Sequence, residues 1–291
     1  MNGLLVVDKP AGITSHDVVA RVRRATGESS IGHLGTLDPM ATGVLPLLLG
    51  KYTRLAQFFN AGEKSYTGTI RFGFATDTYD AEGQPTGEPQ PVVLTVESLR
   101  EEAARFRGTI EQMPPPYSAK KIQGKPAYKL AREGKTPELK PARITVELFT
   151  IDSLHGDAAS FTMVISAGGY VRSIAHEMGQ SLGCGAHLAS LRRTAAGPFT
   201  LEQALPLEEV EALSVAGALQ RHLPHPRTLL PEMPAVTADE HTIGRIRNGM
   251  QINLPEYSGA PQIKIFAGQR ELAAVGRRIA GTLFQPFVVL L

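Results

Sequence analysis

The chain has 291 residues, which is more than a typical single domain needs and enough for one large core with a small appended module. Its composition, with 42% hydrophobic residues, 29 Gly and 21 Pro and no internal repeat, excludes a low-complexity or repeat protein. The formal charge of +2, from 30 Lys and Arg against 28 Asp and Glu, is by itself weak support for a nucleic-acid partner.

The N-terminal segment predicts a strand followed by a capped helix. Residues 3–7 form an apolar run that is too short for a signal-peptide core or a membrane span, so we expect a cytoplasmic protein. Thr14 or Ser15 can cap a helix whose apolar residues share one face, and Gly27 ends that helix. The single cysteine, Cys184, cannot form an internal disulfide, which agrees with a reducing compartment and a structural thiol.

The middle of the chain alternates between irregular and regular patterns. Residues 31–50 are rich in Gly, Pro and Thr and show no helical or strand period, so we expect an ordered, buried loop there. A strand is predicted at 66–74, and a helix at 95–107 has acidic residues early and basic residues late. Strand signals return at 144–151 and at 161–165.

The C-terminal half contains one notable junction and a separate module. A helical pattern over 171–182 follows the last of these strands, so Tyr170 and Arg172 lie at a strand-to-helix junction, where functional side chains are often found. After a linker rich in Pro and His at 223–227, residues 231–291 show short apolar runs separated by Gly and Asn turns. This pattern predicts a small β module, such as a barrel.

A basic segment lies between residues 117 and 143. It contains eight basic and two acidic residues, which gives a local charge of +6. Such a segment fits a polyanion, because neutralised phosphates release counterions, although a solvated basic loop is the plainer alternative. The residues most suited to bind RNA are Lys120, Lys121, Lys125, Lys129 and Arg132.

Near-matches to cofactor motifs fail on inspection. Gly50 and Lys51 resemble the end of a phosphate-binding loop, but Tyr52 occupies the Ser/Thr position. His176 begins a zinc-protease pattern, but Gln180 stands where the second histidine is required, so we expect an ordinary helix-surface residue. Neither a metal nor another cofactor is therefore expected.

An irregular loop at 32–43 contains one carboxylate, Asp38, between a leucine and a proline. The residues alone leave two interpretations open, a turn-capping aspartate or a catalytic one, because Asp before Pro is a common turn former.

Several motifs in chain order resemble the TruB-type pseudouridine synthases, and the likeness covers most of residues 3–199. The motifs are DKPAGITS at 8–15, GHLGTLDPMATG at 32–43, KSY at 64–66, TDTYDAEG at 76–83, PPYSAK at 115–120, GYVRS at 169–173 and LRRT at 191–194. The resemblance implies isomerisation of a T-loop uridine of tRNA, at position 55, to pseudouridine. This reaction moves the ribose bond from N1 to C5 of the base without redox change or consumption of water, so a site free of cofactors is adequate.

The resemblance also implies a fold and a division of the chain. We expect an α/β (α+β) fold with a mixed, mostly antiparallel central sheet flanked by helices in residues 1–230. Residues 231–291 resemble a PUA domain in length, position and β pattern. This module would contact the acceptor end of tRNA through basic residues, namely Arg245, Arg247, Arg277 and Arg278.

Three site residues carry the chemistry that the resemblance implies. Asp38 matches the family's catalytic aspartate, which acts at the sugar as a nucleophile or by deprotonating C2′. Arg172 matches the arginine that pairs with this carboxylate, with a surface arginine at a helix start as the alternative. Tyr66 matches a tyrosine against the target base, where it either removes the C5 proton or only stacks; a strand-core tyrosine is the plain alternative.

The remaining matches are supporting residues. Tyr170 matches a second pocket tyrosine, and Leu191 helps to wall the uracil pocket. His33 matches a histidine that helps to extrude the target nucleotide, with a hydrogen-bonded loop histidine as the alternative. Lys9 and Pro10 match residues that support the site from behind.

The basic segment at 117–143 matches a mobile insertion that closes over the T arm. The expected partner is therefore tRNA, bound by a monomer without a guide RNA, although the guide-dependent relatives are a rival within the same chemistry. A rival from another class is an RNA chaperone that remodels the T arm independently of catalysis.

Overall fold

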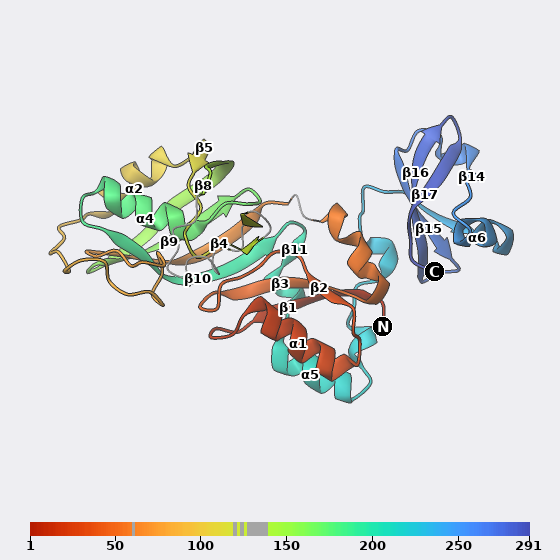
Figure 1. Cartoon of the computed structure of the whole chain (residues 1–291), viewed down its shortest axis with the longest axis horizontal. Helices are drawn as coiled ribbons and strands as arrows, with labels where there is room; N and C mark the ends of the chain where they lie inside the picture. Colours follow the sequence, from red (N-terminus) through yellow and green to blue (C-terminus); the bar gives the residue numbers. More distant parts are fainter. Residues whose placement is uncertain (60–61, 119–120, 123–124, 127–138) are drawn as a thin grey trace.

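The structure is a computed structural model, whose described residues form a large sheet and a smaller one joined by a linker, and a two-stranded hairpin (Figure 1). It describes residues 1–59, 62–118, 121–122, 125–126 and 139–291. Of the predicted RNA-binding residues, Lys120, Lys129 and Arg132 lie outside the described residues. Lys121 and Lys125 lie in a short hairpin of β6 (Lys121–Ile122) and β7 (Lys125–Pro126).

The large sheet is mixed and mostly antiparallel, as predicted. Over the described residues its strands follow the order β12-β1-β3-β10-β4-β9-β8-β5, with β2 beside β3 and β11 beside β10. Within that part of the chain, the pairs β1–β12 and β3–β10 are the parallel ones. The bounds are β1 Gly3–Lys9, β2 Ile31–His33, β3 Thr42–Leu49, β4 Lys64–Phe72, β5 Gly108–Gln112, β8 Ala142–His155, β9 Ala158–Ile165, β10 Ala186–Ala196, β11 Phe199–Thr200 and β12 Leu205–Pro206.

Two pairs of helices pack against this sheet (Figure 1). Helices α1 and α5 lie side by side next to β1, whereas α2 contacts β8 and α4 contacts β10. Thr14 and Asp17 form the capping box of α1, and Gly27 ends it in the left-handed conformation, as predicted. The bounds are α1 Ser15–Thr26, α2 Val96–Arg105, α4 Val171–Ser181 and α5 Leu207–Val215, and the 3₁₀ turns are η1 Gly50–Phe58, η2 Leu201–Gln203, η3 Leu219–Arg221, η4 Pro226–Thr228 and η5 Pro255–Tyr257. In the described part of the chain, no helix has the length and apolar character that a membrane crossing requires.

The prediction of a buried loop over residues 31–50 was wrong in part. The structure places β2 at the start of this stretch and β3 over its last third, and the segment between them is irregular. All residues of β3 except Thr42 are buried, because elements cover both faces of the strand. A strand that is buried on both faces shows no alternation, so its pattern did not reveal it.

The C-terminal residues form the predicted small β module. Its strands in the described residues follow the order β13-β15-β16-β17-β14. The sequence did not predict helix α6 (Glu240–Arg247), which Asp239 caps and which buries Ile243 and Ile246. The strand bounds are β13 Ala235–Ala238, β14 Ile252–Asn253, β15 Gln262–Ala267, β16 Glu271–Ala280 and β17 Leu283–Val289.

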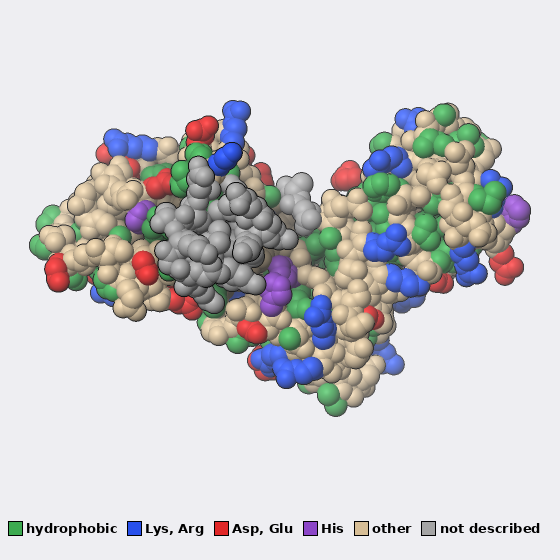
Figure 2. Space-filling view, viewed as in Figure 1, with side chains coloured by type: hydrophobic (Ala, Val, Ile, Leu, Met, Phe, Trp, Pro, Cys, Tyr) green, Lys and Arg blue, Asp and Glu red, His purple; other side chains and the backbone are tan. Residues whose placement is uncertain are grey.

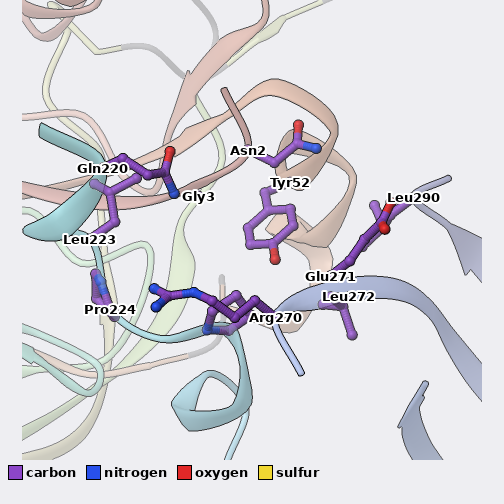
Figure 3. A pocket seen from close by; sticks show the side chains of 11 residues that line it. Asn2, Gly3, Tyr52, Gln220, Leu223, Pro224, Arg270, Glu271, Leu272 and Leu290 are labelled. Atoms are coloured by element: carbon purple, nitrogen blue, oxygen red, sulfur yellow. The ribbon is translucent and has the colours of Figure 1, made fainter. Parts of the chain in front are cut away.

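The two sheets share an apolar cluster at their junction. Leu4 and Leu48 of the large sheet belong to the same buried cluster as Phe266 and Leu272 of the small one. Beside this cluster lies a cavity of about 320 Å³. Figure 3 shows the Tyr52 hydroxyl pointing into this cavity from η1. Burial and the nearby Glu271 raise the pKa of Tyr52 to about 12. The small module is thus packed onto the large sheet and is not a loosely tethered appendage.

Gly43 lets two strands approach closely, and we expect its replacement by alanine to destabilise the protein strongly. Its φ is +103°, and a Cβ at this position would lie 2.2 Å from the Arg193 carbonyl oxygen of β10. Strain and clash together should cost about 3 kcal/mol, which lowers the Tm on the order of 10 °C. Gly12→Ala is the control, because Gly12 also has a positive φ but no atom near the added carbon. Equal Tm values for the two variants would show that the close approach contributes nothing.

Candidate active site

The loop between β2 and β3 presents Asp38 to the first turn of α4. Arg172 contacts this carboxylate with two nitrogens: Nε lies 2.9 Å from Oδ2, and Nη2 donates to Oδ1 over 3.0 Å. The hydrogen bond from Nη2 and the ion-pair contact of Nε together orient the carboxylate and favour its charged form. The structure therefore brings together the two residues that the sequence placed 134 positions apart.

The Arg172 guanidinium is buried and has further partners. Nη1 donates to the Thr78 carbonyl over 3.0 Å, and Nη2 donates to the Tyr117 carbonyl over 3.0 Å. The carboxylate of Asp80, which unlike that of Asp38 is buried, lies 3.4 Å from Nη1. Sequence reasoning did not single out Asp80, although the motif TDTYDAEG contains it. Arg172 thus lies between two carboxylates and holds the loop at 76–83 next to Asp38.

The charge on Asp38 results from opposing effects. Burial raises its pKa above the ordinary value of 3.8, and the nearby Asp80 acts in the same direction. Arg172 opposes both because it stabilises the carboxylate form. About a third of the Asp38 side chain, 34%, remains exposed. The carboxylate is thus firmly oriented and still reachable by a substrate.

Lys9 supports the Asp38 loop by hydrogen bonds to its backbone. Its side chain is fully buried, and Nζ donates to the carbonyls of Pro10, Pro39 and Ala41 at 2.8, 3.1 and 2.7 Å. Burial lowers the pKa of Lys9 to about 8, so the ammonium stays largely charged at neutral pH. Two of these carbonyls, those of Pro39 and Ala41, follow Asp38 in the chain, and the ammonium therefore fixes the backbone after it.

A second buried cation, Arg193, holds the other side of the same loop. Its Nε donates to the Val44 carbonyl over 2.8 Å, and Nη2 donates to the Gly35 carbonyl over 3.0 Å. Sequence reasoning quoted Arg193 within LRRT but gave it no role. The available signal was a pair of adjacent arginines in a strand, one of which must face the interior.

A cavity of about 250 Å³ opens in front of Asp38. Five of the predicted site residues line it, namely Asp38, Tyr66, Tyr170, Arg172 and Leu191. Tyr66 enters from β4 and is buried, which raises its pKa, while the guanidinium of Arg193 opposes this shift. Tyr170 precedes α4, and both backbone polar groups of this residue are hydrogen-bonded to the Gln112 side chain. The cavity therefore combines one carboxylate with two phenols and an aliphatic wall.

The structure places His33 outside the residues that line this cavity. It ends β2, and its ring meets the His16 ring edge-on at a centroid distance of 5.4 Å. Burial lowers the pKa of His33, and its Nδ1 is buried without a hydrogen-bond partner among the described residues. His33 is thus a neutral ring that lies two residues before Gly35, the first residue of this loop that lines the cavity.

Comparison with known proteins gives a consistent picture. A model described as the N-terminal domain of TruB family pseudouridylate synthases matches residues 23–171, and one described as the tRNA pseudouridylate synthase B C-terminal domain matches residues 172–230. The chain is 45% identical to tRNA pseudouridine synthase B of Solibacter usitatus, over the full length of both. It is 42% identical to the protein of the same name from Aquifex aeolicus, over 97% of this chain and 98% of that one.

Solved structures show the same fold at lower identity. One is a Cbf5-Nop10-Gar1 complex, with a TM-score of 0.72, 24% identity and coverage of 99% of this chain and 85% of that one. Another is an H/ACA RNP bound to a substrate RNA containing 2′-deoxyuridine, with a TM-score of 0.70 and 23% identity over 99% of this chain and 85% of that one. At this identity the likeness establishes the fold of the chain.

Proposed function

The chain belongs to the TruB family of pseudouridylate synthases, and from this premise we propose that it isomerises uridine 55 in the T loop of tRNA. The observation that carries the proposal is the Asp38 carboxylate, which Arg172 orients at the mouth of a cavity lined by tyrosines. A charged group that is fixed before substrate binds needs little reorganisation during the reaction.

The reaction needs one oriented carboxylate and a pocket for the base. Asp38 either attacks C1′ of the ribose or removes the C2′ proton, and the C1′–N1 bond breaks in both routes. The base then turns within the pocket and C5 bonds to C1′. This step breaks the bond between Asp38 and C1′ in the first route and returns the proton from Asp38 to C2′ in the second. The C5 proton then leaves and N1 gains a proton. Tyr66 of β4 and Leu191 of the neighbouring strand β10 both line the cavity, and they enclose the base during this turn. Tyr66 is also a candidate for removing the C5 proton.

The target uridine has to leave the stacked T loop before its C1′ can meet Asp38. His33, at the edge of the site, fits the task of occupying the vacated space, because its ring is neutral and presents a flat surface. Tyr170 lines the side of the pocket formed by α4. Lys9 and Pro10 support the site from behind, because the Lys9 ammonium holds the backbone of the Asp38 loop and its charge also favours the carboxylate form of Asp38.

The test is to follow tritium release from C5-labelled uridine in an unmodified tRNA transcript and to map the modified position. About one equivalent released per tRNA, with pseudouridine at position 55, supports the proposal. Release from a position outside the T loop would overturn the site assignment, and no release would overturn the enzymatic function.

We propose that residues 1–230 form the catalytic unit and that residues 231–291 add affinity for tRNA. Figure 2 shows Lys and Arg side chains on the visible face of the small module and near its junction with the large sheet. Arg277 and Arg278 are exposed on β16, where Arg277 lies over the Phe287 ring and Arg278 donates to the Ser258 carbonyl. Arg245 donates to the Gln251 carbonyl. Because deletion of residues 231–291 would also expose the shared apolar cluster, point substitutions are the cleaner probe.

Arg277→Gln combined with Arg278→Gln should weaken tRNA binding without slowing the bound reaction. If both arginines neutralise phosphates, the slope of log Kd against log salt should fall by about 2. Single-turnover rates at saturating enzyme should stay unchanged. Arg105→Gln is the control, because it removes an exposed arginine from α2, which lies at the opposite end of the molecule from the small module (Figure 1). If the Kd and the salt slope stayed unchanged, β16 would not contact tRNA.

A further inference from the structure

Three consecutive residues of the loop at 76–83 contact helix α4. The Thr78 carbonyl and the Asp80 carboxylate both meet Nη1 of Arg172, at 3.0 and 3.4 Å. Between them, the ring of Tyr79 stacks on the ring of His176, with centroids 3.7 Å apart and planes 11° from parallel. His176 lies one helical turn after Arg172, so both side chains project from the same side of α4. The stack and the arginine contacts therefore join the same two segments.

Tyr79 adopts a backbone conformation that its side chain disfavours. Its φ is +66°, and the one other described non-glycine residue with a positive φ is Leu230. This conformation costs about 1–2 kcal/mol for a residue with a bulky side chain. An aromatic pair contributes about 0.5–1.5 kcal/mol beyond burial, which is the size needed to offset much of that cost. The stack is thus a main reason why the loop can hold this conformation.

The surrounding bonds show what the conformation achieves. The Tyr79 carbonyl accepts from the Leu188 amide over 3.0 Å, and the Thr76 hydroxyl donates to the Asp80 carbonyl over 2.7 Å. The first bond ties the loop to β10 and the second closes the loop on itself, while the Tyr79 ring ties the loop to α4. The backbone turn at Tyr79 then leaves the Thr78 carbonyl and the Asp80 side chain facing Arg172.

His176 contacts the loop through the face of its ring. Its buried nitrogen, Nδ1, makes no hydrogen bond to the described residues. Burial lowers the pKa of His176, so the stacked ring is neutral at physiological pH. A buried, unpartnered nitrogen costs about 1–3 kcal/mol of folding free energy. The stack on Tyr79 is the stabilising contact that the His176 ring makes.

We propose that Tyr79 and His176 are positioning residues, whose stack locks the loop at 76–83 onto α4 so that Thr78 and Asp80 hold the Arg172 guanidinium against Asp38. Neither ring lines the cavity in front of Asp38, so their influence on the reaction passes through Arg172. The effect on turnover rests on the proposed function, whereas the effect on Asp38 itself does not.

Four variants separate the stack from the backbone and from the imidazole. Tyr79→Asn removes the ring but keeps a residue that tolerates a positive φ, and His176→Ala removes the partner ring. Tyr79→Phe and His176→Phe retain two facing rings without the hydroxyl or the imidazole. Phe106→Ala is the matched control, because it breaks another aromatic pair, between α2 and β8, that includes no residue of α4 or of the loop.

The first readout is the pKa of the Asp38 carboxyl in the RNA-free protein. It is measured from the pH dependence of the ¹³C chemical shift of this carboxyl group. Tyr79→Asn and His176→Ala should raise this pKa by about one unit, a tenfold change in the protonation equilibrium, because Arg172 loses its alignment. The two Phe variants and Phe106→Ala should match the wild type. None of the variants alters another ionisable group that acts on Asp38 or is acted on by it, namely Arg172, Asp80, Lys9, Glu82, Tyr66 and Tyr170.

The second readout is turnover on tRNA. Tyr79→Asn and His176→Ala should lower kcat about tenfold and move the acid limb of its pH profile upward, with KM nearly unchanged. A pKa of Asp38 that stays at the wild-type value in both variants would overturn the proposal, as would Phe variants that behave like the ring-deleted ones. A wild type without activity, combined with the predicted pKa changes, would overturn the proposed function and leave the positioning role standing.

Discussion

Asp38→Asn should reduce tritium release from the labelled tRNA by a factor on the order of 10³ or more, with little loss of stability. Asparagine has the same shape but neither the negative charge nor the basicity that attack at C1′ or proton removal at C2′ requires. Burial already penalises the charged form of Asp38, as the raised pKa shows, so neutralising it should leave the free energy of unfolding nearly unchanged. Single-turnover kinetics and thermal melting measure the two effects separately.

The control for this substitution is Asp8→Asn. Asp8 also forms a forked ion pair, with Arg192 at 3.1 and 2.7 Å, but it does not line the cavity. This variant should keep wild-type turnover. If Asp38→Asn retained a tenth of the wild-type rate, Asp38 would not be the reacting carboxylate. If it lost turnover but fully restored growth under conditions that require the gene, remodelling of the T arm would be the main output of the protein.

Arg172→Met should lower kcat by about two to three orders of magnitude and shift the acid limb of the pH profile to higher pH. Arg172 is the group that favours the carboxylate form of Asp38 against burial and against Asp80. Without it the pKa of Asp38 should rise further, so that a smaller fraction of the enzyme is ionised at a given pH. The rate at alkaline pH, where Asp38 is ionised again, then reports the loss of orientation alone.

The same substitution should destabilise the fold in a pH-dependent way. Arg172 separates two carboxylates, and its loss leaves both without their shared cation, which costs about 3 kcal/mol at neutral pH. A carboxyl whose pKa is raised in the folded state destabilises that state once the pH exceeds the unfolded value. The loss in Tm should therefore be largest near pH 7 and shrink toward pH 4. Arg192→Met should show a much smaller effect, because the Arg192 side chain is far more exposed than that of Arg172 and pairs with the single carboxylate of Asp8.

A pH-independent loss of Tm in Arg172→Met would contradict this electrostatic account and indicate a packing role for the side chain. An unchanged acid limb of the pH profile would show that Arg172 does not control the charge of Asp38.

Local patterns in the sequence were sufficient for several elements of the structure. The Thr14 cap and the Gly27 stop defined α1, because capping depends on hydrogen bonds within a few residues. The strand at β1 and the helices α2 and α4 followed in the same way from short-range periodicity. The motifs around Asp38 and Arg172 were sufficient to indicate that these residues belong to one site.

Other features required the tertiary structure, because their partners are distant in the chain. The strand β3 was hidden by burial on both faces, which removes the alternation that marks a strand. The roles of Arg193 and Lys9 depend on carbonyl groups of the Asp38 loop, and every residue has a carbonyl, so the sequence cannot indicate which ones a buried cation will meet. The contacts of Asp80 with Arg172 and of Tyr79 with His176 likewise exist only once α4 packs beside the loop at 76–83. The sequence by itself determined which residues are chemically capable, whereas tertiary packing decided their orientation and charge, because both depend on distances of a few ångströms between segments far apart in the chain.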